Sequence, residues 1–529
     1  MRLSNKNKIS DFKKIINFEL SKRGDFDNLK YQPTFKSSAI FYFIFNNSIN
    51  TKISFLNYWK LKNLNNDVSC LYTVRDINGK KIYRDFFKLK NNTYTFSLKK
   101  ILKEKLDINE LTGSINIELF SSDDLKFAYP AIDAIYETEH GVSLVHSNQR
   151  VLDEIKDNLE NQSLNQTQTG FDIYCDNEKN SFFVAINGSL EIKNKQLKIN
   201  FINSKGKQLQ KNFKFKLIKA YSVIQINLNE IKGLKYFFNK EKGFCKINLP
   251  TENIFNRVLI GTLSKDKKKI TTTHSYYDCS KINDYVNITK LNPDEYSCYI
   301  PFNLIENIDL EIVIYPIFSK CNLIFDLEMY NKLGFKKVIK ENLLELRKNF
   351  KQSVSIKINK YLKNIKNVTD NVYCLKVNSQ DGKIPTRMTY GFNYKQVSFG
   401  SNISDAMVVN HGIKSRSNTS KGFYWGPVFN SKNISTTIAL SFINNTSKDE
   451  KQSVNLKIYD QKNIIYQKKF RIKSPEAINL DIKKLINKKN KITKDNILWF
   501  SLESSGPKNF VCKHVHKSIY GHISADHSF

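Results

Sequence analysis

Three histidines near the C-terminus, His514, His516 and His522, are the side chains whose types and spacing could do chemistry together. His514 and His516 stand two residues apart, so on a strand they share a face. If the chain turns back over 517–521, His522 arrives opposite His516 on that same face. Three imidazoles on adjacent strands suit a divalent transition metal. The pattern predicts a metal site here, with an adventitious histidine cluster as the alternative.

No motif of an enzyme class accompanies this cluster. The sequence has no HExxH, GxSxG or P-loop pattern, and no GxGxxG with the flanks of a nucleotide-binding turn. Asp526 and Glu503 are the neighbouring carboxylates that could act as a ligand or a base. The acids Asp133, Glu137 and Glu139 lie far upstream without a partner set. A metal-dependent enzyme built on the three histidines is therefore one hypothesis, and no cofactor other than a divalent transition metal is expected.

Four other histidines each end a short run with the character of a strand. They are His146, His274, His411 and His527, at intervals of 128, 137 and 116 residues. Alternation along each strand places the histidine in the more apolar row, which favours a half-buried imidazole that closes the end of a sandwich. In the alternative interpretation, four equivalent strand ends line one shared ligand site.

Two arginines and one tryptophan extend that second interpretation. Arg150 and Arg416 follow His146 and His411 by four and five residues and would supply donors for an anion. Trp425 lies in the glycine-flanked run 422–426, where an aromatic ring can stack on a sugar or plug the end of a core. We keep these residues as candidate ligand-binding positions.

An internal repeat must position these residues. A short alternating strand that runs into one helical turn begins at Phe96, Ile226, Ile356 and Leu480, in each case 47 to 55 residues before one of the four histidines. Further upstream, two alternating runs are joined by turns at 76–79, 203–206, 331–334 and 460–463. Asn-Gly and related pairs supply the positive φ angles that tight hairpins require. The recurrence predicts one unit repeated four times.

The predicted fold is all-β, with four tandem antiparallel β-sandwiches of about 115 residues each. Turn signals fall about every 8–12 residues and no long helical period occurs. The expected divisions are an N-terminal extension over 1–35, which could form one short helix, and sandwiches over 36–156, 168–282, 296–416 and 418–529. The sequence identifies no family.

The composition limits the partners. The chain has 529 residues and a formal net charge of +34, from 84 Lys+Arg against 50 Asp+Glu. Such an excess attracts polyanions, although lysine is frequent throughout, so nucleic acid is not indicated beyond the charge itself. Eight scattered cysteines without a CxxC pair are typical of reduced core thiols. With no apolar leader and no run long enough to span a bilayer, a cytoplasmic protein without a transmembrane segment is expected.

Repetition without a catalytic constellation favours a non-catalytic binding or scaffold protein, because multivalent binders gain avidity from similar copies. Its partner would be an acidic glycan, another polyanion or a protein. The alternatives are the metal-dependent enzyme and a structural component of a larger assembly, in which sandwich edges pair between chains.

Overall fold

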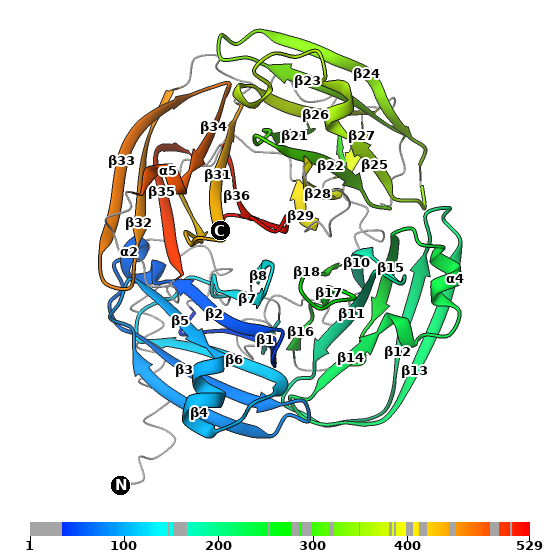
Figure 1. The fold of residues 1–529 in the computed structure, drawn as a ribbon, viewed down its shortest axis with the longest axis vertical. Helices are drawn as coiled ribbons and strands as arrows, with labels where there is room; N and C mark the ends of the chain where they lie inside the picture. The colour runs from blue at the N-terminus through cyan, green and yellow to red at the C-terminus, as the bar shows by residue number, and fades with distance from the viewer. Residues whose placement is uncertain are drawn as a thin grey trace.

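The fold is that of a computed structural model of the chain. It describes residues 34–127, 129–146, 149–151, 167–251, 254–277, 285–287, 298–316, 322–348, 350–379, 383–385, 388–397, 406–411, 421–443, 451–486, 497–507 and 510–529. The expected N-terminal extension and its helix therefore lie almost wholly outside the described residues. Strands dominate, and Figure 1 shows them in four groups arranged round a common centre.

The first two groups cover the N-terminal half. Group 1 contains β1 (Lys36–Phe45), β2 (Asn50–Leu56), α2 (Tyr58–Asn63), β3 (Val68–Asp76), β4 (Lys81–Lys88), β5 (Thr93–Ser97), η1 (Lys100–Glu104), β6 (Leu111–Ser121), β7 (Asp133–Thr138) and β8 (Gly141–His146). Group 2 contains β10 (Gln168–Ile173), β11 (Lys179–Ile186), β12 (Ile192–Ile202), β13 (Gln208–Ile218), β14 (Val223–Asn227), η2 (Leu228–Glu230), α4 (Leu234–Phe238), β15 (Gly243–Asn248), β17 (Leu259–Ser264) and β18 (Ile270–His274).

The last two groups cover the C-terminal half. Group 3 contains β21 (Cys298–Phe302), β22 (Ile308–Ile314), β23 (Leu323–Tyr330), β24 (Lys336–Leu346), β25 (Val354–Lys357), η5 (Ile358–Tyr361), η6 (Val368–Asp370), β26 (Val372–Ser379), β28 (Met388–Gln396) and β29 (Ala406–His411). Group 4 contains β30 (Lys421–Val428), β31 (Ile434–Phe442), β32 (Lys451–Tyr459), β33 (Ile464–Lys473), β34 (Glu476–Asp481), α5 (Ile482–Leu485), β35 (Leu498–Pro507), β36 (Phe510–Ser518) and β37 (Ile523–His527).

The same order of strand pairing recurs in all four groups. In group 4 one sheet has the order β30-β35-β32-β33 and the other β34-β31-β36-β37, and groups 2 and 3 pair their equivalent strands in the same way. In group 1 the two halves, β4-β3-β6-β1 and β5-β2-β7-β8, join where β1 meets β2. All of these pairings are antiparallel, as in a β-sandwich. The prediction of an all-β fold of sandwich-like units is confirmed.

The hairpin turns form where the sequence predicts them. Gly79, Gly206 and Gly334 have φ angles of 82°, 74° and 84°, in the left-handed region that glycine adopts without strain. In each turn the glycine amide donates to the carbonyl three residues earlier. The fourth turn, 460–463, closes without glycine, through a hydrogen bond from the Asp460 amide to the Asn463 carbonyl. A helical turn also follows the predicted strand in every group, as η1, η2, η5 and α5.

Four short strands lie outside the groups. These are β9 (Arg150–Val151), which pairs with β16 (Ile254–Phe255), and β20 (Tyr285–Asn287), which pairs with β27 (Lys383–Pro385). The strand β19 (Tyr276–Tyr277) pairs with the edge of group 2 through β10. Because β9 and β20 pair with strands that lie far along the chain, the segments between groups also contribute to the sheets. The exact sandwich boundaries stay a prediction.

Apolar side chains pack continuously across each junction between neighbouring groups. One core contains Phe41 and Trp59 of group 1 together with Leu259 of group 2 and Trp499 of group 4. A second core joins group 2 to Tyr315 of group 3, and a third joins group 3 to group 4. Four groups that each pack on two neighbours form a closed ring (Figure 1).

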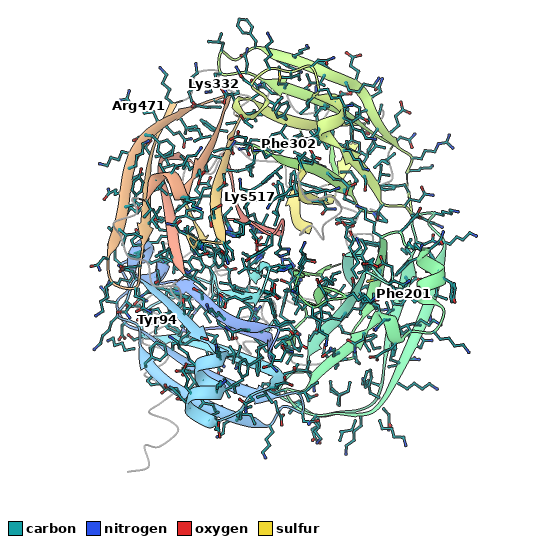
Figure 2. The ribbon with its side chains drawn as sticks, in the orientation of Figure 1. Tyr94, Phe201, Phe302, Lys332, Arg471 and Lys517 are labelled. Atoms are coloured by element: carbon teal, nitrogen blue, oxygen red, sulfur yellow. The ribbon has the colours of Figure 1, made fainter. Side chains whose placement is uncertain are left out.

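Polar contacts fix the same junctions. The Trp499 indole donates to Ser54 Oγ at 2.9 Å between groups 4 and 1, and Tyr42 donates to Gln225 Oε1 at 3.0 Å between groups 1 and 2. Lys242 and Glu311 form an ion pair of 2.8 Å between groups 2 and 3. Figure 2 shows Phe201 and Phe302 among the strands of their groups and Arg471 on the outer rim.

The described thiols and helices bear on the expected compartment. Five cysteines are buried thiols: Cys70, Cys175, Cys245, Cys374 and Cys512. Among the residues that the structure describes, the helices are too short to cross a bilayer. The cytoplasmic location stays a prediction.

We expect Trp499→Ala to lower the free energy of unfolding by about 3–5 kcal/mol, because it empties a fully buried site at the junction of groups 4 and 1. Denaturant unfolding measures the change. The control is Tyr236→Ala, since that side chain is 88% exposed and its loss should cost less than about 0.5 kcal/mol. A loss below about 1 kcal/mol for Trp499→Ala would show that this junction contributes little to the ring.

Candidate functional site

The innermost strands of the four groups, β8, β18, β29 and β37, come together at the centre of the ring. Each of them ends at a histidine: His146, His274, His411 and His527. β8 lies against both β18 and β37, and β29 lies against β18 and β37. The repeat therefore places one histidine position of each group in the same central region. The side chain of His411 lies outside the described residues, but its strand pairs with β28, where it stands opposite Met388.

His146 joins two of the other groups. Its Nε2 lies 3.1 Å from Nε2 of His274 in group 2, and its Nδ1 lies 2.8 Å from Oδ2 of Asp526 in group 4. His527 packs its ring edge-on against that of His146, with the centroids 4.9 Å apart. Ligand atoms of His146, Asp526 and His527 all lie within 4.8 Å of one another. Side chains separated by up to 381 positions in the sequence thus form one cluster, the central cluster.

Hydrogen bonds fix which ring nitrogen of each histidine carries a proton. His274 Nδ1 lies 2.8 Å from the carbonyl of Ser275, and a carbonyl only accepts, so Nδ1 donates. His527 Nδ1 makes the same contact, at 3.3 Å, with the carbonyl of Ser528. His146 Nδ1 donates to the Asp526 carboxylate. In the neutral rings, Nε2 of all three histidines therefore carries the lone pair.

The two facing Nε2 atoms are spaced as ligands of one ion. Zinc–imidazole bonds of 2.0–2.1 Å in a tetrahedral site place two nitrogens about 3.3 Å apart, and the separation of His146 and His274 is 3.1 Å. Asp526 holds Nδ1–H of His146, which is the arrangement by which carboxylates orient metal-binding histidines. Without an ion, one of the two rings must carry an extra proton to turn the contact into a hydrogen bond.

Electrostatics decides which ring takes that proton. Burial lowers the pKa of His146, but the charge and hydrogen bond of Asp526 outweigh burial, so the net pKa is raised. Burial and the nearby His146 charge hold the pKa of His274 well below its usual range. Burial raises the pKa of Asp526, yet His146 more than compensates and the pKa falls. Asp526 is therefore a carboxylate, and His146 is the ring that charges when no cation is bound.

Asp133 adds a second carboxyl group beside His146. It stands directly opposite His146 in the pairing of β7 with β8, and such cross-strand neighbours share a face. Its side chain is buried, and neither carboxyl oxygen has a hydrogen-bond partner among the described residues. Burial and the charge of Asp526 raise its pKa well above the usual range. The sequence showed this acid but gave it no partner, because only the strand register places it at the histidine.

The C-terminal histidines lie differently from the expectation. His514 and His516 do share a face, with Nδ1 of one 3.0 Å from Nε2 of the other. The expected position of His522 opposite His516 is wrong: β36 pairs with β37 so that Ser524 lies opposite His516. The chain turns back later than expected, and His522 Nε2 instead donates to the carbonyl of Val142 in group 1.

Two further candidate residues are part of packed regions. The buried Arg150 guanidinium lies over the rings of Tyr129 and Phe255, at 4.6 and 5.2 Å from their centroids. Trp425 is buried in the core that joins groups 4 and 1, and its ring stacks on Phe529. Arg416 lies outside the described residues.

The comparisons with known proteins leave the family open. No protein-family model matches the chain, and no curated protein is similar to it. Two solved structures of alpha-2-macroglobulin from Escherichia coli, one trypsin-activated and one in the native conformation, align with 91% of this chain at 9% identity, with TM-scores of 0.12 and 0.10. This chain spans 30% and 28% of their lengths.

The buried C-terminal histidines make the stability depend on pH. Burial lowers the pKa of His514 and of His522 to about 4, and that of His516 well below its usual range. As the pH falls from about 6.5, the unfolded chain takes up protons that the folded chain does not, so stability is lost progressively. The pKa of His146 is raised in the folded protein, so His146 acts in the opposite direction: its contribution to the stability of the protein is lost as the pH rises.

We expect wild-type protein to lose roughly 3 kcal/mol more stability between pH 7 and pH 4 than His522→Gln, because 1.36 kcal/mol accompanies each unit of pKa shift. Glutamine can still donate to the Val142 carbonyl but does not titrate. Unfolding curves with a chelator present give the difference, and the contribution of His146 is common to both proteins. Parallel pH dependences would mean that folded His522 binds its proton normally.

Proposed function

We propose that this protein binds a divalent transition metal ion at the centre of its ring, between Nε2 of His146 and Nε2 of His274, with Asp526 and His527 beside His146. One observation carries the proposal. Nε2 of His146 and Nε2 of His274 face each other at 3.1 Å while Nδ1 of both rings already donates to an oxygen acceptor. Two lone pairs at this distance repel unless a proton or a metal ion lies between them, and neutral imidazoles are ligands of zinc, copper, iron and nickel.

The surrounding charges support a cation at this place. Asp526 is ionised and accepts a hydrogen bond from His146, and the buried Asp133 stands opposite that histidine in the strand pairing. An isolated buried carboxylate is costly unless a positive charge accompanies it. A divalent ion bound to neutral imidazoles would compensate the Asp526 carboxylate and lower the pKa of the Asp133 carboxyl group.

His411 marks the equivalent strand-end position in group 3. It ends β29 in group 3 as the other three histidines end β8, β18 and β37, and β29 lies between β18 and β37 at the centre. With four imidazoles, each group would contribute one ligand. The ion would then tie together the inner ends of the whole ring and act as a structural centre of a scaffold or binding protein.

Elemental analysis of purified protein tests the proposal. We expect about one transition-metal ion per chain after dialysis against a metal mixture, and loss of most of it in His146→Ala, His274→Ala and His411→Ala. Metal binding to the folded state alone should also raise the unfolding free energy, by about 2.7 kcal/mol when the free ion is at a hundred times its Kd.

His516→Gln is the matched control, because it removes a buried imidazole from the C-terminal pair but none from the central cluster. If His516→Gln loses the metal and His274→Ala keeps it, the metal binds at His514, His516 and His522 instead of the central cluster. That outcome would support the hypothesis of a metal-dependent enzyme. Wild-type protein without stoichiometric metal would refute both sites.

Binding of an acidic glycan or another polyanion is the second candidate function. The net charge of +34 favours anion binding. Two lysine-lined cavities at groups 1 and 2 also favour it, because they provide a specific place where an anion could bind.

A further inference from the structure

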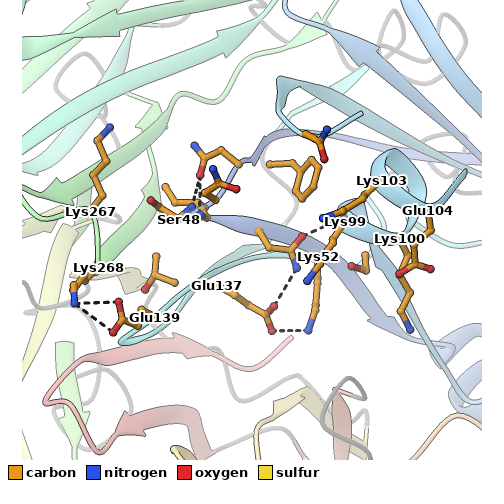
Figure 3. Close-up of a pocket in the computed structure, with 18 of the residues that line it drawn as sticks. Ser48, Lys52, Lys99, Lys100, Lys103, Glu104, Glu137, Glu139, Lys267 and Lys268 are labelled. Carbon is orange, nitrogen blue, oxygen red and sulfur yellow. Dashed lines mark hydrogen bonds and ion pairs between the residues drawn. The ribbon is translucent and has the colours of Figure 1, made fainter. Parts of the chain in front are cut away.

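A cavity of about 740 Å³ opens between group 1 and the turn that joins β17 to β18 in group 2 (Figure 3). The β1–β2 hairpin, η1, the end of β7 and that turn supply its walls. Six lysines line it: Lys52, Lys99, Lys100, Lys103, Lys267 and Lys268. The cavity is within the range of about 300–1,000 Å³ that is typical of sites for small ligands.

The acids of this cavity compensate only part of the charge. The cavity is also lined by four acids: Glu104, Glu137, Glu139 and Asp266. Two pairs are formed, Lys52 with Glu137 at 2.6 Å and Lys268 with Glu139 at 3.1 Å. The four remaining lysines then face two acids, Glu104 and Asp266, which leaves an excess of two positive charges.

A second cavity, of about 810 Å³, adjoins the first. Five lysines line it (Lys179, Lys235, Lys240, Lys265 and Lys269) with three acids, one of which, Asp266, lines both cavities. The turn 265–269 therefore separates two basic cavities. Together they contain 11 lysines among 28 lining residues, whereas Lys and Arg make up 84 of 529 in the chain. This share is about two and a half times the share of Lys and Arg in the whole sequence.

We infer that these adjoining cavities bind a small ligand that carries two or more phosphate or sulfate groups. Lysine ammonium groups bind such anions as point charges, and asparagine side chains such as Asn47 and Asn109 on the wall of the first cavity can contact neutral polar atoms of the ligand. Among the described lining residues, Phe45 is the one aromatic side chain of the first cavity, and those of the second include none. Binding of single-stranded nucleic acid normally uses several stacking rings, so a compact polyanion fits better.

This inference rests on the second candidate function, anion binding, and is independent of the central metal. The test is isothermal titration of the full chain at low salt with tripolyphosphate and, separately, with a heparin-derived tetrasaccharide. We expect binding that weakens with salt, and the tighter of the two probes identifies phosphate or sulfate as the preferred group.

The double variant Lys99→Ala/Lys267→Ala removes one lysine from each side of the first cavity and should weaken binding at least tenfold. The matched control, Lys340→Ala/Lys468→Ala, removes two exposed lysines from β24 and β33 and leaves the affinity within about twofold. Equal weakening in both variants would overturn the location while anion binding itself survived. Failure of wild-type protein to bind either probe would refute anion binding altogether and leave the metal proposal untouched.

Discussion

Closure of the ring is the constraint on which the rest of the structure depends. Four strand groups joined in series could extend as a string, but the last group packs its aromatic side chains on the first. The ring centroids of Trp425 and Tyr58 lie 4.9 Å apart, and the Trp499 indole donates a hydrogen bond to Ser54 Oγ. Burial of large aromatic side chains is among the strongest contributions to such a junction. Only a closed ring places Asp526 of group 4 against His146 of group 1.

Closure also explains why the polar cluster is at the centre. The innermost strand of each group lies against the innermost strands of two other groups, so polar groups near its end have little access to water and bond to one another. Three described imidazoles do so through a carbonyl or carboxylate at Nδ1. An imidazole suits this place because it has an apolar ring and two polar atoms.

The groups differ at the position opposite the terminal histidine. Asp133 faces His146, Leu259 faces His274, Met388 faces His411, and Lys513 faces His527. Lys513 is buried with its ammonium 3.3 Å from the centroid of the Phe392 ring, and burial lowers its pKa to about 7. The repeated scaffold thus holds a buried acid beside the histidine of group 1 and a buried lysine of lowered pKa beside that of group 4. The basic cavities follow a different principle, with solvated lysines where two groups meet.

The sequence alone determined the local structure: the all-β class, the four hairpin turns and the helical turn after one strand in each group. These depend on alternation and on residues such as Gly79, whose conformational freedom acts within a few positions. The tertiary structure decided which of the eight histidines meet. His516 lost its expected neighbour because β37 pairs with β36 two residues further along than expected, so Ser524 and not His522 lies opposite His516. His146, His274 and Asp526 meet through ring closure, which no local pattern encodes, because it results from apolar packing between distant groups.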